Sequence, residues 1–136
     1  MTGRTLLGAV GAWVALLVIM FVNGTGRVLV LQPRFGEDPA RRVASLIGVG
    51  LVTAFSYLYV RLSALRASRE LLLVGVLWLG LTLSFEFGFG RASGRSWPEL
   101  LADYDLARGR LWPLVLVATL LSPWAWGMLL ARNTVR

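Results

Sequence analysis

One carboxylate lies at the end of a long apolar run, and its chemistry stands out from the rest of the chain. Residues at spacings of three and four before Glu86 share one face of a predicted helix with it, namely Gly75, Trp78 and Thr82. An ionisable side chain at membrane depth is costly and marks a candidate proton, ion or ligand site. Glu86 is also close to the helix end, where a salt bridge to Arg91 or Arg27 would fix one end of a helix bundle. The sequence leaves both roles open, and the structural salt bridge is the simpler interpretation.

Other charged residues fall in the segments predicted to lie at the same end of the bundle. We group them into one candidate site, made of Glu86, Arg91, Arg27, Arg34, Asp103, Asp105 and Arg110. Guanidinium groups bind phosphates and carboxylates through paired hydrogen bonds, and basic clusters beside membrane helices bind anionic headgroups. The simpler interpretation is a set of solvated charges without a ligand, and the alternative is a shared pocket for a lipid headgroup or a small anion.

The residue types that are missing narrow the chemistry further. The 136 residues include no His and no Cys, and all 14 basic residues are arginines. The chain therefore offers no disulfide, no cysteine nucleophile, no lysine Schiff base and none of the usual zinc ligands. We expect no metal and no cofactor. An enzyme would have to use Glu86, Asp103 or Asp105 for acid–base catalysis.

Long apolar runs make up most of the sequence. Hydrophobic residues account for 57% of the chain, charged residues for 15%, and the mean hydropathy is +0.69, whereas soluble domains contain about 45–50% apolar residues. Crossing a bilayer takes about 20 such residues, and four runs qualify. The sequence predicts an all-α membrane protein, a single domain over 1–136 with four transmembrane helices in one bundle, at about 6–22, 43–62, 71–88 and 111–130.

Turn residues indicate where the first two helices end and begin. Gly24 and Gly26 are expected to end the first helix, and Asp38 followed by Pro39 is typical of a helix start. The apolar residues 28–31 between these signals are expected at the membrane surface or beneath the other loop. The first run is longer than a secretory signal core of about 7–15 residues, so we expect it to remain uncleaved.

A short amphipathic helix is predicted between the third and fourth spans. Ser96 and Glu99 have the spacing of a capping box. Apolar residues then recur at helical spacing, namely Trp97, Leu100, Leu101 and Tyr104. This pattern predicts an interfacial helix over about 97–108 that lies across the end of the bundle.

Tryptophans mark the borders of the predicted spans. Indole rings gather at membrane interfaces, and the expected belt residues are Trp97, Trp112, Trp124 and Trp126. Trp13 and Trp78 fall in mid-span, where they would fill helix contacts or face lipid. Pro123 is expected to kink the fourth helix, and the carbonyl that it frees needs another donor, such as a neighbouring hydroxyl.

The two ends of the bundle differ in charge. The end with both termini has six arginines and a single acid, Glu70, and the other end has eight arginines and the remaining acids. Arginine numbers alone give no clear bias under the positive-inside rule. We assign both termini to the cytoplasm and the mixed-charge end to the extracytoplasmic side. The net charge of +7 is attributed to membrane anchoring, and no nucleic-acid partner is expected.

Short segments in the second half of the chain carry a resemblance to a known group of proteins. These segments are 85–91 (FEFGFGR), 96–97 (SW), 100–105 (LLADYD) and 109–113 (GRLWP). With them, the chain resembles a family of small bacterial four-helix inner-membrane proteins of unassigned function. The resemblance implies a bacterial inner-membrane location and brings no activity or catalytic residue.

Three kinds of function are compatible with these observations. The sequence favours a small polytopic membrane protein that acts as an accessory or interaction subunit or binds lipid. The alternative is a small oligomeric transporter or channel with Glu86 as its protonatable residue, and an enzyme is least favoured. The expected partners are the lipid bilayer, an anionic headgroup or small anion, and a larger membrane protein or a second copy of the chain.

Overall fold

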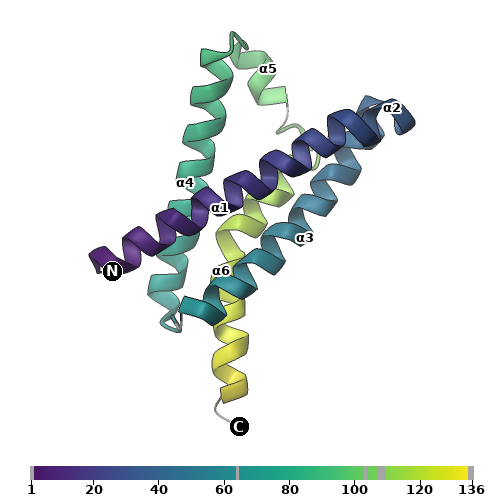
Figure 1. The fold of residues 1–136 in the computed structure, drawn as a ribbon. Coiled ribbons are helices and arrows are strands. Elements are labelled where there is room, and N and C mark those ends of the chain that lie inside the picture. Colours follow the sequence, from purple (N-terminus) through teal and green to yellow (C-terminus); the bar gives the residue numbers. More distant parts are fainter. Residues whose placement is uncertain (1, 64, 103, 107–109, 135–136) are drawn as a thin grey trace.

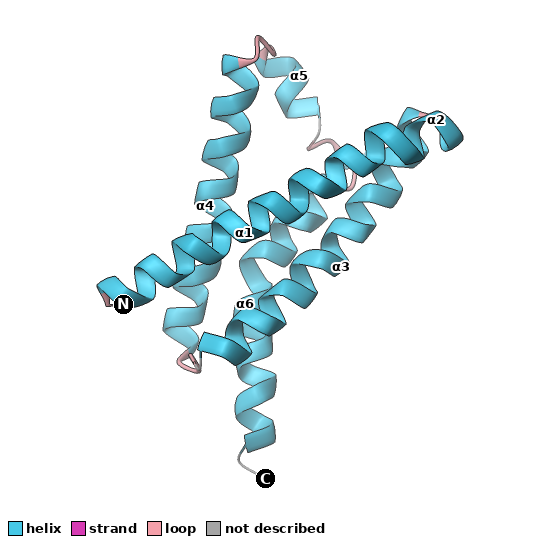
Figure 2. Ribbon diagram, viewed as in Figure 1, coloured by secondary structure: helices cyan, strands magenta, loops and turns pink. Residues whose placement is uncertain are grey.

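The computed structural model describes residues 2–63, 65–102, 104–106 and 110–134, and these residues form helices joined by short connections (Figures 1 and 2). Four helices are long and apolar enough to cross a membrane, which confirms the predicted number. The elements in chain order are α1 (Gly3–Gly26), η1 (Arg27–Leu31), α2 (Gln32–Phe35), α3 (Glu37–Ser63), α4 (Ser68–Ala92), α5 (Trp97–Ala102) and α6 (Trp112–Thr134).

Helix α6 is the centre of the bundle and packs along both α3 and α4, while α1 lies across α3 and α4 (Figure 1). Two glycines permit the close approach of α4 and α6. A Cβ at Gly75 would overlap the backbone carbonyl of Leu120, and a Cβ at Gly127 would overlap the side chain of Leu71. Figure 1 also shows α5 and α2 at one end of the molecule, with the α3–α4 connection and the end of α6 at the other.

Indole rings fill the contacts in the middle of the bundle. Trp78 is fully buried, and its Nε1 donates to the carbonyl oxygen of Ala9 at 2.9 Å. One turn further along both helices, Trp13 Nε1 donates to Thr82 Oγ1 at 3.0 Å. The indole N–H of a buried tryptophan needs an acceptor. Here the acceptors lie on the neighbouring helix, so the two hydrogen bonds join α1 to α4. Both mid-span tryptophans are therefore helix contacts rather than lipid-facing bulk.

Two of the tryptophans expected in interfacial belts also turn inward, which corrects that expectation. Trp126 Nε1 donates to the carbonyl oxygen of Thr53 at 2.9 Å, and the ring stands edge-on to Tyr57 at 4.9 Å. Trp112 is half-buried and donates to Glu86. Among the described residues, Trp97 keeps the expected exposure, at 52%.

The first helix does not end at its glycines, so that prediction is wrong. Gly26 keeps right-handed helical dihedrals, and the chain continues through the π-turn η1 into α2. Residues 28–31, expected at a surface or under a loop, belong to this continuous helix. Ending the helix there would leave its last backbone carbonyl groups without intrahelical partners, and this cost exceeds the weak helix propensity of glycine.

The π-turn immediately precedes a proline. Pro33 has no N–H, and its ring would clash with the carbonyl four residues earlier in a straight α-helix. The wider turn, closed by the hydrogen bond from Gln32 N–H to the Arg27 carbonyl, relieves that clash. The helix ends at Phe35, and its C-cap Gly36 has a φ of 87°, which favours glycine. Helix α3 then begins at Glu37, two residues before Pro39, the expected first helical position after an Asp38 N-cap.

The capping box before α5 is confirmed, but the helix is shorter than predicted. Glu99 N–H donates to Ser96 Oγ at 3.4 Å, and Ser96 Oγ lies 3.1 Å from Glu99 Oε1. The helix ends at Ala102 instead of near residue 108, and the chain turns at Tyr104. That turn brings the Tyr104 side chain towards α4. Helix α6, in contrast, continues through Pro123 as one helix.

Candidate arginine site at one end of the bundle

A cavity of about 610 Å³ lies at the end of the bundle that carries α5 and α2. Figure 1 shows α1 crossing in front of α4, so that the α5 end of α4 and the α2 corner lie apart. The cavity is lined by residues of α1, η1, α3, α4 and α5 and by the segment that leads into α6. We call it the arginine cavity, because its charged lining residues are Arg27, Arg41, Arg95, Arg110 and Glu86.

The charge of this lining is strongly positive. Four guanidinium groups and one carboxylate give a formal charge of +3 (four minus one) for the described lining residues. Each arginine comes from a different part of the fold: η1, α3, the α4–α5 connection and the segment before α6. Repulsion among cations held around one cavity is offset when an anion sits between them. The arrangement is therefore suited to a phosphate or carboxylate ligand.

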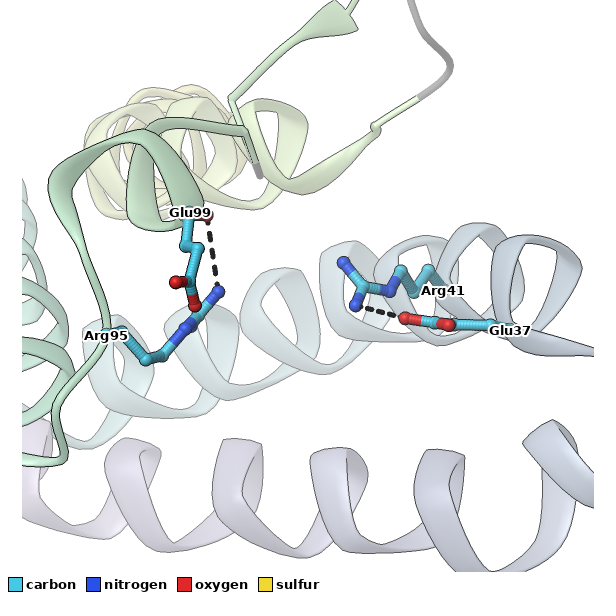
Figure 3. A network of polar contacts seen from close by, with 4 residues as sticks. All are labelled: Glu37, Arg41, Arg95 and Glu99. Atoms are coloured by element: carbon cyan, nitrogen blue, oxygen red, sulfur yellow. Dashed lines mark hydrogen bonds and ion pairs between the residues drawn. The ribbon is translucent and has the colours of Figure 1, made fainter.

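Two of the arginines have local partners that fix their position at the rim (Figure 3). Arg41 forms an ion pair with Glu37 one turn earlier in α3, with Nη2 and Oε1 2.6 Å apart. Arg95 Nη2 donates to the carbonyl oxygen of Glu99 at 3.3 Å. A solvent-accessible ion pair such as Glu37–Arg41 contributes only about 0–1 kcal/mol to stability. The main effect of the two contacts is to limit the directions in which the Arg41 and Arg95 guanidinium groups point.

Arg110 carries a buried donor group without an acceptor in the described part of the chain. Its Nη1 is buried and has no hydrogen-bond partner among the residues that the structure describes. Leaving a buried charged donor without an acceptor costs more than the roughly 1–3 kcal/mol of a neutral group. A bound anion would supply the missing acceptor.

The floor of the cavity is built around Glu86. Its Oε2 accepts hydrogen bonds from the Tyr104 hydroxyl at 2.6 Å and from Trp112 Nε1 at 3.2 Å. The Tyr104 ring also stacks on Phe87, with centroids 5.7 Å apart and planes 12° apart. These contacts tie the end of α4 to the α5–α6 connection and to the start of α6. Glu86 is thus a positioned acceptor that holds the mouth of the bundle together.

A close contact between α4 and α5 holds this connection in place. Leu100 is 4% exposed, and a Cβ at Gly90 would overlap its side chain. Because glycine lacks that atom, α5 folds back against the end of α4. The turn after α5 then brings Tyr104 to Glu86.

The π-turn contributes to the site from the opposite side. Such turns widen the helix, change the phase of the following side chains and are frequent at functional sites. Here the turn starts at Arg27, which lines the cavity. One turn earlier, Asn23 Nδ2 donates to the carbonyl oxygen of Ala44 at 3.0 Å. This bond joins α1 to α3 next to the arginines.

The structure brings together only some residues of the candidate site that was grouped from the sequence. Glu86, Arg27 and Arg110 line the arginine cavity together. Arg34 is exposed on α2, and Arg91 is exposed with its guanidinium carbon 5.5 Å from the centre of the Trp97 ring. Asp105 is half-buried in the turn after α5, where its carbonyl oxygen accepts from Arg110 N–H at 3.2 Å. Asp103 lies outside the described residues.

The lining residues that were not singled out from the sequence as site members include Arg41, Arg95, Tyr104 and Trp112. A signal was present for Arg41. It precedes Ala44 and Gly48 by three and seven residues, and both of these small residues are buried against the bundle. For the other three, the relevant contact joins segments that only the tertiary fold brings together.

A second, apolar cavity of about 410 Å³ adjoins the first. We call it the apolar groove. Residues of α1, α3, α4 and α6 line it, namely Trp13, Leu16, Leu17, Val18, Met20, Phe21, Val52, Thr82, Phe85, Glu86, Trp112, Val115 and Thr119. Both cavities include four of these residues, Met20, Phe85, Glu86 and Trp112. The groove therefore continues the arginine cavity towards the middle of the bundle.

The composition of the two cavities limits the chemistry that they support. Within the described ranges, no three carboxylates gather closely enough to hold a metal ion. The polar groups of the arginine cavity are guanidinium, hydroxyl, indole and amide donors around one carboxylate. No family model, curated protein or solved structure matches this chain. The geometry of the site is thus the basis for a functional proposal.

Proposed function

We propose that this protein is a multi-pass membrane protein that binds an anionic phosphate-type headgroup in the arginine cavity and does not chemically convert it. The single observation that carries this proposal is Arg110, whose buried Nη1 lacks a partner among the described residues of a cavity lined by four arginines. A phosphate group accepts several hydrogen bonds at once and matches the guanidinium fork.

The proposed membrane location rests on the long apolar helices and on the sequence resemblance. Four apolar helices of sufficient length support insertion in a membrane, and the resemblance in segments 85–113 supports a bacterial inner membrane. With both termini in the cytoplasm, the arginine cavity faces the extracytoplasmic leaflet. We therefore propose a lipid-associated or accessory role, in which the bound headgroup, a larger membrane partner or a second copy completes the assembly.

The proposal is tested by measuring binding of dioleoyl phosphatidic acid to the purified protein by native mass spectrometry. Arg110→Gln should weaken binding about 10- to 100-fold, since a hydrogen bond to a charged group contributes about 1.5–3 kcal/mol. Arg34→Gln is the matched control, because it removes the same charge from an exposed position at the same end of the bundle. Equal affinities of the two variants would contradict the proposal.

Further ligands distinguish the possible sources of the headgroup. Dioleoyl phosphatidylcholine carries a compensating positive charge and should bind more weakly than phosphatidic acid. Inorganic phosphate offers the same acceptor oxygens without a chain. Binding of inorganic phosphate that is as tight as that of phosphatidic acid, and equally sensitive to Arg110→Gln, would identify a small-anion site.

The second candidate function is a small oligomeric transporter or channel with Glu86 as its protonatable residue. It is favoured by the position of Glu86, which lines both cavities. This function predicts ion or solute flux in liposomes that Glu86→Gln abolishes while the protein still folds. Normal flux in Glu86→Gln would exclude this mechanism.

A further inference from the structure

We infer that the ligand of the arginine cavity is a lipid, and that one of its acyl chains lies in the apolar groove between α1 and α4. This inference rests on the proposed function and adds the chemical class and the binding pose of the ligand. Its structural basis is the continuity of the two cavities, which share lining residues at the level of Glu86 and Trp112. A ligand with a charged head and an apolar tail fits both parts at once.

The side chains of the groove match a hydrocarbon chain. Apart from Glu86 at the junction, its described lining consists of aliphatic and aromatic residues and two threonines. Thr82 Oγ1 already accepts the Trp13 indole N–H, and Thr119 Oγ1 donates to the Val115 carbonyl at 2.8 Å. The hydroxyl groups are therefore engaged within the protein, and the groove offers mainly apolar contact.

The groove is open on its α1 side. Val18 is 58% exposed and Phe21 is 72% exposed, and both line it. The hydrogen bond between Trp13 and Thr82 marks its inner end, since these two residues belong to its lining. A chain could thus enter sideways from the bilayer, without passing through the packed contacts among α3, α4 and α6.

The length of the two cavities along the axis of α1 is comparable with the thickness of one leaflet. α1 lines the groove from Trp13 to Phe21, which is about 12 Å of helix at about 1.5 Å per residue. Half of a bilayer hydrocarbon core is about 15 Å thick. From Phe21, the lining continues to Arg27 in the arginine cavity, about 9 Å further along the helix. The headgroup then lies near the membrane surface and the chain lies below it.

The experiment compares two phosphatidic acids with the same headgroup, one with dioleoyl and one with dihexanoyl chains. Val18→Trp places a large ring in the open side of the groove. It should weaken binding of the dioleoyl lipid about tenfold and leave binding of the dihexanoyl lipid unchanged. Val14→Trp is the matched control, because Val14 is 49% exposed one turn earlier on the same helix and lies outside the lining of both cavities.

The outcomes separate this inference from the proposed function. If Arg110→Gln weakens binding of both lipids and Val18→Trp weakens neither, the chain does not lie in the groove and the headgroup site stands. If neither variant weakens binding, both proposals fall. Phe21→Ala, which removes one wall of the groove at an exposed position, gives a second measurement and should lower affinity for the dioleoyl lipid alone.

Discussion

At the scale of single residues, Glu86 is held by neutral donors from distant parts of the chain. The Tyr104 hydroxyl and the Trp112 indole both donate to one carboxylate oxygen. The arginine nearest in sequence, Arg91, instead lies over the Trp97 ring and donates to the carbonyl oxygen of Arg95 at 3.1 Å. A carboxylate at the end of an apolar helix thus joins three segments of the chain.

The hydrogen bond from Tyr104 to Glu86 should contribute measurably to stability. Tyr104→Phe keeps the ring stacked on Phe87 and removes the hydroxyl, so we expect the free energy of unfolding in detergent to fall by about 1.5–3 kcal/mol. Tyr57→Phe is the control, since the Tyr57 hydroxyl accepts from an exposed arginine, Arg61. Unfolding curves of the two variants that coincide would show that the Glu86 contact is not stabilising.

At the scale of helices, close packing of α4 on α6 depends on the absence of a side chain at Gly75. Gly75 lies on the same face of α4 as Trp78 and Glu86. The face of α4 that packs on α6 therefore also carries the carboxylate. α1 is held more loosely, through two tryptophan hydrogen bonds and its contact with α3. This difference in packing leaves room for the apolar groove between α1 and α4.

Alanine substitutions of two glycines in α4 should have different effects on stability. Gly75→Ala forces a methyl group onto the Leu120 carbonyl, so overpacking should lower the free energy of unfolding by about 1–3 kcal/mol. Gly80→Ala is the control, because a Cβ at that position meets open space. It should be neutral or stabilising by up to about 1 kcal/mol, owing to the higher helix propensity of alanine. Chemical unfolding of both variants measures the difference, and a neutral Gly75→Ala would contradict this packing.

At the scale of the whole molecule, much of the architecture could be predicted because it depends on local signals. Apolar length predicts four long helices, the capping-box spacing predicts the start of α5, and helical spacing places Gly75, Trp78, Thr82 and Glu86 on one face. Each of these signals lies within a few residues of the feature that it predicts.

The features that escaped prediction depend on contacts between distant segments or on competition between signals. The glycines near residue 25 suggested a helix end, but the chain stays helical as far as Phe35. The grouping of Arg41 and Arg95 with Arg27 follows from the crossing of α1, α3 and α4, which periodicity does not determine. The inward turn of Trp112 likewise requires Glu86 to be its neighbour in the fold.

The proposed topology can be tested directly because the chain contains no cysteine. Single variants Thr2→Cys and Arg34→Cys place a thiol at exposed positions at opposite ends of the bundle. In intact cells, a membrane-impermeant maleimide should label Arg34→Cys at once and Thr2→Cys only after the inner membrane is permeabilised. The reverse pattern would place the arginine cavity on the cytoplasmic side.

The most direct test of the headgroup site is the ratio of two dissociation constants for dioleoyl phosphatidic acid, that of Arg110→Gln over that of Arg34→Gln. Both variants lose one positive charge at the same end of the molecule, so the ratio isolates the effect of the buried guanidinium group. A headgroup bound in the arginine cavity predicts a ratio of about 10 or more. A ratio of one, with both variants folded, would show that the lipid responds only to overall charge and would contradict the proposed site.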